Sequence, residues 1–438
     1  MRRGAQLVLA GSAALALAVG LFTVGSPGGS RTGGSGAAPS SAPAQPNAPA
    51  DPLAKGIMAA QTRLAQNPND YGTWADLGLG YVQQAKATVD PSYYGKAEGA
   101  VARSLKLNTT ENFKGWGARA ALKAAEHDFR AARDAALHGI RIDGYNSVLY
   151  GALGDAYTQL GEYDLAAKAV DKMNQLRPGV PSFTRASYVF ELRGDVPQAR
   201  AALDRALSDS KDPGNMAFTQ NYLAELSFNY GGDAAAALQH FQAGLTADPR
   251  DFVLLAGKAK AEAALGRVDQ ALTDYRTVVA AVPQPQYVLE LAELEQSRHL
   301  GDATKQYSLF HTEEQLFTAN GVTLDVEPTL FEADHGSPAK ALQYAAAGWK
   351  VRPFLEMADA YAWAEYVNGH YPAALGWSDK AAATGWHNAL FLFHRGMIEK
   401  AMGRPAPAKA DLAAALKVNP HFNVLQAPVA HKALASLA

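Results

Sequence analysis

From about residue 53 to the C-terminus, apolar and polar residues follow the pattern of paired amphipathic helices. Apolar side chains recur three or four residues apart, which is the spacing of one face of an α-helix. A glycine separates the two segments of each pair, and many units end near a proline, with a period of about 34 residues. A period held over most of a chain predicts a repeat array rather than a set of globular domains.

The clearest unit runs from Ser147 to Pro178. It carries Tyr150, Leu153, Gly154, Tyr157, Gly161, Tyr163, Ala166, Val170 and Pro178. The small residues Gly154, Ala166, Ala199 and Ala271 are expected where helix backbones approach most closely. Glycines at 161, 194, 232, 266, 336, 369 and 403 are expected to end the first helix of each pair in the left-handed conformation.

This spacing resembles the tetratricopeptide repeat (TPR) pattern W-x2-LG-x2-Y…A-x3-F…P. The resemblance implies an all-α, right-handed superhelical solenoid of about ten antiparallel helix pairs, preceded by one transmembrane or signal helix and a disordered linker. We expect the solenoid to span 53–438, with an N-terminal half-unit at 55–68 and a capping helix at 427–438. The clearest repeats are predicted at 147–180, 180–213, 252–285, 322–355, 355–388 and 389–422.

The register weakens at 287–336. We expect one distorted repeat there, with a shortened turn at Gly301, an extended connector over GVTLDVEP (321–328) and a bend in the superhelix. A separate small domain is the alternative, although about fifty residues is short for an independent core.

The N-terminus indicates export. Arg2 and Arg3 precede an apolar stretch at 5–25, long enough to span a bilayer as a helix. The arginines favour an N-terminus on the inner side. Residues 1–25 are therefore predicted to be either an uncleaved single-pass anchor, in contact with the membrane through 5–25, or a cleaved signal peptide. Residues 26–52, rich in Gly, Ser, Pro and Ala, are predicted to be a disordered linker. Both interpretations place the solenoid in an extracytoplasmic location, membrane-anchored or secreted.

The amino-acid composition excludes several kinds of partner and of functional site. The 40 Lys and Arg residues nearly balance the 42 Asp and Glu residues, so no electrostatic argument favours nucleic acid as a partner. The chain has no cysteine, which excludes disulfides, thiolate metal sites and thiol nucleophiles. The alanine-rich composition, doubled arginine and long tether resemble exported TPR proteins of actinobacterial type.

No catalytic motif stands out in the chain: it contains no H-E-x-x-H, G-x4-G-K-[ST] or G-x-S-x-G sequence. We expect no enzymatic activity, no cofactor and no metal. Two alternatives remain open. One is an enzyme-associated regulatory protein acting at the cell envelope, with chemistry near His311 and His335. The other is carbohydrate binding through the aromatic residues Trp363, Tyr366, Tyr371, Trp377 and Trp386.

The resemblance implies a mode of action, because the first helices of TPR arrays line a concave groove that grips a peptide or a partner protein. In this register the groove residues are Asp155, Thr158, Thr184, Tyr188, Glu191, Asn221, Glu225 and Phe228, beside Gly151. Such a mixed acidic and aromatic surface would suit an extended segment with basic and apolar side chains. The partner itself is unknown. The Lys/Asn-rich clamp with which some relatives hold a chaperone's carboxyl terminus is absent from these positions.

Overall fold

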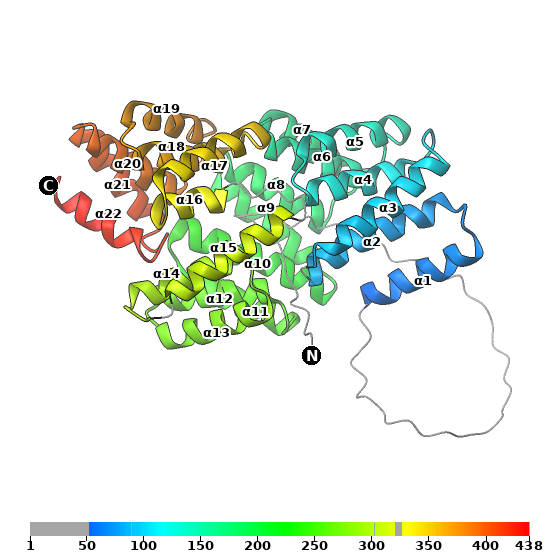
Figure 1. Ribbon diagram of the computed structural model, residues 1–438, viewed down its shortest axis with the longest axis horizontal. Coiled ribbons are helices and arrows are strands. Elements are labelled where there is room, and N and C mark those ends of the chain that lie inside the picture. Colours follow the sequence, from blue (N-terminus) through cyan, green and yellow to red (C-terminus); the bar gives the residue numbers. More distant parts are fainter. Residues whose placement is uncertain (1–51, 89, 302, 320–325, 438) are drawn as a thin grey trace, which may run out of the picture.

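The computed structural model describes residues 52–88, 90–301, 303–319 and 326–437. Over these residues it contains 22 α-helices and no strand (Figure 1). The expectation of an all-α array of paired helices is therefore confirmed. The helices are α1 Pro52–Gln66, α2 Tyr71–Thr88, α3 Ser92–Leu107, α4 Phe113–Ala125, α5 Phe129–Ile142, α6 Ser147–Gln159, α7 Tyr163–Leu176, α8 Val180–Glu191, α9 Val196–Asp209, α10 Pro213–Gly231, α11 Ala234–Ala247, α12 Phe252–Ala264, α13 Val268–Ala281, α14 Pro285–Ser297, α15 Ala303–Ala319, α16 Val326–Asp334, α17 Pro338–Val351, α18 Leu355–Val367, α19 Tyr371–Ala381, α20 Ala389–Ala401, α21 Pro405–Val418 and α22 Gln426–Ala435.

Helices α2 to α21 form ten consecutive pairs, in which an even-numbered first helix packs against the odd-numbered helix that follows it. Helices α1 and α22 pack against the two ends of this array. The predicted anchor or signal segment (1–25) and residues 26–51 of the predicted linker lie outside the described residues. Within the described ranges, no helix has both the length and the apolar character needed to cross a bilayer.

Short polar residues begin many of the helices. Asp128, Asn146, Asp195, Asp233 and Asn388 each accept a hydrogen bond from a backbone N–H in the first turn of the helix that follows. Such a cap contributes about 1 kcal/mol because it satisfies a donor that has no partner within the helix. These caps fix where each helix of the array begins.

Small residues bring the two helices of a pair together, as the sequence predicts. A methyl group built on Gly154 would lie 3.0 Å from Cγ2 of Val170 in the following helix. Ala166, Ala199 and Ala271 have no more than 1% of their surface exposed. Side chains of this size are required there, because larger ones would push the helix backbones apart.

Six of the predicted turn glycines, at 161, 194, 232, 266, 369 and 403, have φ between 56° and 78°. Gly336 is not among the residues with positive φ, so its predicted role as a left-handed turn is wrong; a side chain there would instead meet the Glu332 carboxylate. His127 and His299 occupy the left-handed position in the α4–α5 and α14–α15 turns, with φ of 62° and 57°. Histidine adopts this conformation more often than most non-glycine residues.

The irregular stretch continues as helices. Residues Val326–Pro328, expected to be extended, form the first turn of α16, while 320–325 lie outside the described residues. Aromatic side chains connect α15 to α16: the Phe310 and Phe331 rings stack with their centroids 4.5 Å apart, and His335 stacks on Tyr307 at 4.6 Å. This contact joins the first seven pairs to the last three through side chains.

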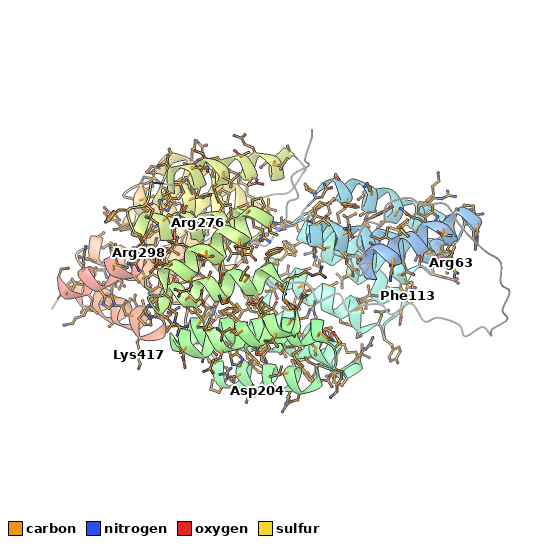
Figure 2. The ribbon with its side chains drawn as sticks, turned by 90° about the horizontal axis from the view of Figure 1, so that it is seen from below. Arg63, Phe113, Asp204, Arg276, Arg298 and Lys417 are labelled. Carbon is orange, nitrogen blue, oxygen red and sulfur yellow. The ribbon has the colours of Figure 1, made fainter. Side chains whose placement is uncertain are left out.

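The last repeats fold back onto the middle of the array. In Figure 1 the end of α17 lies beside α7, and α22 lies near α14. Figure 2 shows Lys417 of α21 close to the green middle helices, with Arg63 of α1 at the opposite end. Helix α21 packs on α10, and Asn423 Nδ2 donates to Glu293 Oε2 of α14 over 2.7 Å. Segments far apart in the sequence are therefore in direct contact.

This contact is a regular seam of turns on loops. The turns at Gly161, Gly194 and Gly232, in three successive pairs, rest on the loops at Pro353, Gly385 and Pro420. A methyl group on Gly194 would lie 2.5 Å from the Gly385 carbonyl oxygen, and one on Gly161 would overlap the carbonyl oxygen of Pro353. We call these three turn-on-loop contacts the seam. They close one turn of the superhelix upon another.

Candidate functional site

The first helices of the central repeats carry a row of charged side chains on one side of the array. We call this row the first-helix face and define it as Asp155 (α6), Arg185 and Glu191 (α8), Glu225 (α10), Lys260 (α12) and Glu290 (α14). Asp155 contacts Arg185 and Glu225 contacts Lys260, while burial, and with it the charge of Glu225, raises the pKa of both Glu191 and Glu290. Charged groups are costly to bury, and a row of them therefore marks a candidate for function.

One end of the face is a buried ion pair. Arg185 Nε donates to Asp155 Oδ1 over 2.9 Å and its Nη2 donates to Oδ2 over 2.7 Å, while Nη1 donates to the Pro181 carbonyl. Both side chains have about 5% of their surface exposed. The two-pronged geometry matches the guanidinium fork to the carboxylate and offsets much of the cost of removing both charges from water.

Lys86 of α2 lies near this pair. The pKa of Lys86 is lowered to about 8, mainly by burial; the charge of Asp155 opposes this shift and the positive charge of Arg185 adds to it. One carboxylate thus faces two cationic groups. The ammonium form of Lys86 is less favoured here than in water because it is desolvated beside another cation.

The middle of the face is built around Lys260. Its Nζ donates to both oxygens of Glu225, over 2.8 and 2.9 Å, and lies 5.2 Å from the centre of the Phe228 ring. Burial lowers the pKa of Lys260, but Glu225 and Glu290 outweigh that effect and raise it. Burial raises the pKa of Glu290, which Lys260 and a hydrogen bond from Gln286 partly offset. A cation held by carboxylates over an aromatic ring is an arrangement that stabilises lysine.

Glu191 has fewer positive neighbours. Its Oε1 accepts a hydrogen bond of 2.8 Å from the Tyr230 hydroxyl. The pKa of Glu191 is raised to about 7, mainly by burial; the hydrogen bond from Tyr230 opposes this shift, and the nearby carboxylates Glu225 and Glu356 add to it. This carboxyl group therefore changes its charge near neutral pH.

A pH dependence follows from Glu191. Because the folded state holds the proton up to about pH 7 and the unfolded state releases it near 4.5, ionisation should remove stability as the pH rises between these values. We expect wild type to lose about 2–3 kcal/mol relative to Glu191→Gln over this range, at about 1.4 kcal/mol per pKa unit. Urea unfolding at successive pH values measures the difference. The exposed Glu111→Gln serves as the control, and parallel pH profiles for wild type and Glu191→Gln would contradict the assignment.

Five of the eight predicted groove residues are not open to solvent. Asp155, Thr158, Thr184, Tyr188 and Phe228 are each less than 9% exposed. The hydroxyls of Thr158 and Thr184 donate to the carbonyls of Gly154 and Val180 one turn earlier in their own helices. Gly151, placed beside the groove, is buried as well. The expectation of an open groove at these positions is corrected, because neighbouring helices and the last repeats cover them.

The remaining three residues keep contact with solvent. Glu191, Asn221 and Glu225 are half-buried. Oδ1 of Asn221 is buried and has no hydrogen-bond partner among the described residues. These three side chains are the part of the predicted site that remains available to a ligand in this conformation.

Several members of the site were missed by sequence reasoning. They are Lys86, Arg185, Lys260, Glu290, Glu356 and Trp386. Lys260 could have been found, because it occupies the same place along α12 that Asp155 occupies along α6. Glu356 and Trp386 carried no local signal, since they reach the site from repeats more than 150 residues away.

Tyrosine hydroxyls connect the first-helix face to the last repeats. Tyr188 donates to Glu356 Oε1 over 3.1 Å, and the backbone N–H of Leu355 donates to the Tyr163 hydroxyl over 2.8 Å. The indole N–H of Trp386 donates to the Tyr230 hydroxyl. Tyr188, Leu192, Leu355, Ala358, Ala381, Trp386 and Phe391 form one buried cluster. The last repeats therefore occupy much of the surface that we expected to be free.

The histidines considered for chemistry have structural partners. His335 Nε2 lies 3.2 Å from Glu293 Oε1, and its ring stacks on Tyr307. His311 lies 3.3 Å from Glu314 on its own helix. Among the described residues, no three His, Asp or Glu side chains are grouped so that they could hold a metal ion.

The aromatic residues considered for carbohydrate binding do not form a common exposed platform. Trp363 and Trp386 are buried, and Trp363 lies between the rings of Tyr366 and His394 at 4.5 and 4.2 Å. Trp377 stacks on Tyr361 at 4.2 Å and carries Lys380 above its ring. Rings already stacked in this way present little free surface to a sugar.

Known proteins share the helical pairing. The family model "Tetratricopeptide repeat" matches residues 148–179, which contain almost all of α6 and α7. No curated protein sequence matches the chain. Among solved structures it is similar to human IFIT1 in a dimer with PPP-AAAA (14% identity, 82% of this chain and 86% of that chain, TM-score 0.45). It is also similar to a tetratricopeptide repeat protein from Parabacteroides merdae (17%, 59% and 98%, 0.36) and to pilF of Pseudomonas aeruginosa (15%, 52% and 94%, 0.37).

The family match falls on the unit whose residues carry the pattern most clearly. Its turn glycine, its buried small residues and its two helices recur along the array. The chain therefore contains a tetratricopeptide repeat at residues 148–179, within an array of ten helix pairs over the described residues.

Proposed function

We propose that the chain is a non-catalytic scaffold that binds an extended segment of a partner protein along its first-helix face. The tetratricopeptide repeat fold supports a role in protein–protein interaction. The observation that carries the proposal is the charged row from Glu191 through Glu225 to Lys260. A solenoid needs only apolar residues to stack its repeats, so charges kept along one face serve recognition.

The charges and aromatic rings of the first-helix face indicate which kind of partner segment would bind there. Glu191, Glu225, Glu290 and Glu356 outnumber Lys260 in the middle of the face, so basic side chains would be attracted there. Phe228 and the tyrosines add apolar and cation–π surface beside the carboxylates. A partner segment with lysine or arginine next to apolar residues suits this combination.

The binding proposal can be tested with residues 53–438 bound to beads and incubated with detergent-solubilised membranes. We expect Glu191→Gln combined with Glu225→Gln to weaken capture of the partner about tenfold or more, because each lost charge-assisted contact is worth at least 1 kcal/mol or so. Asp134→Asn combined with Glu111→Gln on the outer surface is the matched control. If the variant with Glu191→Gln and Glu225→Gln captures as much partner as wild type, the first-helix face is not the binding surface.

We further propose that the solenoid acts outside the cytoplasm, either anchored by residues 5–25 or secreted. The support is the apolar N-terminal stretch behind two arginines. The intact mass of the mature protein decides between anchor and signal peptide. Protease digestion of intact cells decides the side of the membrane: a solenoid protected until the cells are lysed would contradict the proposal.

A further inference from the structure

The last repeats contact tyrosines beside the charged row to which the proposed function assigns binding. Glu356 and Trp386, from the last repeats, hold the hydroxyls of Tyr188 and Tyr230 on the first-helix face. The carbonyls of Lys350 and Val351 also accept hydrogen bonds from Arg130 of α5, 2.8 and 3.2 Å long. A protein segment lying across α6 to α10 would meet these groups of the chain itself before it met the first helices.

The contacts at the seam are of kinds that can be broken and formed again. Its polar contacts are hydroxyl and amide hydrogen bonds, the Tyr188–Glu356 bond and the Arg130 bonds to backbone carbonyls, all of which water can replace when the surfaces separate. A cavity of about 290 Å³ lies within it, lined by Leu192 and Arg193 on one side and Ala383 and Thr384 on the other. Thr384 Oγ1 is buried without a hydrogen-bond partner among the described residues. Such an incompletely filled contact costs less to open than a core.

The seam also opens as a unit, because its three contacts share one register. Gly161, Gly194 and Gly232 lie in successive turns, and Pro353, Gly385 and Pro420 lie in successive loops. A shift of the last repeats that separates one pair of partners is expected to displace the others, because the repeats on each side pack against their neighbours along the array.

We propose that α17–α20 are an intramolecular cover, which occupies the first-helix face of α6–α10 in the resting chain and leaves it when a partner segment binds. This inference rests on the proposed function for its purpose. The occupant of the face is thus the chain's own last repeats, and the partner competes with Glu356 and Trp386 for the hydroxyls of Tyr188 and Tyr230.

The test uses spin labels on cysteines introduced at Asp164 and Ala383, in a chain that has no cysteine of its own. Both positions are exposed and line the same cavity from opposite sides. Pulsed electron spin resonance should give one short distance in the otherwise unchanged chain. Combining Gly161→Ala with Gly194→Ala places methyl groups in the seam and should abolish most of the short-distance population while helical circular dichroism is kept. Gly266→Ala with Gly403→Ala, at turns facing open space, should leave it intact.

A milder variant covers the case in which the glycine variant fails to fold. Tyr188→Phe combined with Tyr230→Phe removes two hydroxyl groups and the three hydrogen bonds that they make, two of which reach the last repeats. It should reduce the short-distance population several-fold. The proposal is overturned if the folded variants keep the wild-type distance. Partner capture by the same variants distinguishes the two proposals. If a variant opens but captures no more partner than wild type, the proposed function is contradicted and the intramolecular cover is not. If the chain binds its partner while the spin labels stay at the short distance, only the intramolecular cover is contradicted.

Discussion

Asp155→Asn is expected to lower the free energy of unfolding by about 3–5 kcal/mol, the usual cost of breaking a buried ion pair from one side. The substitution removes the carboxylate whose charge favours the cationic forms of both Arg185 and Lys86, and it leaves the Arg185 side chain buried without its partner. Arg185→Met should cost less, because Lys86 remains to neutralise Asp155. Chemical denaturation of the three proteins measures the order of their stabilities.

A substitution of Lys86 serves as the control for the predicted effect of Asp155→Asn. Lys86→Met should recover part of the stability lost in Asp155→Asn, because it removes one of the two unpaired cations. In the wild-type background the same change should have a small effect. If Arg185→Met proves more damaging than Asp155→Asn, or if Lys86→Met makes no difference in the variant, the three groups are not coupled.

Gly194→Ala is expected to destabilise the chain by about 3 kcal/mol or more, and Gly266→Ala by only about 1–2 kcal/mol. Both residues have nearly the same φ, 73° and 75°, so both substitutions carry the cost of placing a side chain in the left-handed region. Only Gly194 lies against another part of the chain, where the new methyl group would press on the Gly385 carbonyl.

Because Gly194 and Gly266 have nearly the same φ, the difference between their two stability losses measures the contact of residue 194 with Gly385. Thermal or denaturant unfolding gives the two stability changes, and Gly403→Ala provides a second residue with open space around it. Equal losses at 194 and 266 would show that the turn conformation alone sets the cost and that the contact with Gly385 contributes nothing.

The helical pairs could be predicted from the sequence because their determinants are local. Gly154 and Val170 meet within one unit, and the turn at Gly161 is closed by residues a few positions away. Interactions between neighbours in sequence produce the same period in every unit, so the apolar pattern reports them directly. The turns at His127 and His299 were missed, because a non-glycine residue in the left-handed conformation leaves no compositional mark.

The covering of the site could not be predicted in the same way. The partners of Tyr188 and Tyr230 lie 168 and 156 residues further along the chain. Contacts at that range depend on how far the superhelix turns at each repeat, which is the sum of many small packing angles. The groove register therefore included Glu191 and Glu225, which are partly exposed, but it could not indicate that Tyr188 would be buried against Glu356.

The packing of the last repeats on the middle of the array is tested most directly by site-specific photo-crosslinking. Benzoylphenylalanine in place of Arg193 would stand at the seam, because the Arg193 carbonyl oxygen lies against Gly385 and its side chain lines the cavity with Ala383 and Thr384. We expect irradiation of the folded chain to join this position to the peptide containing 383–387, as read by mass spectrometry. Crosslinks confined to α7, α8 and α9 would show that the superhelix is open and would contradict the closed seam over the first-helix face.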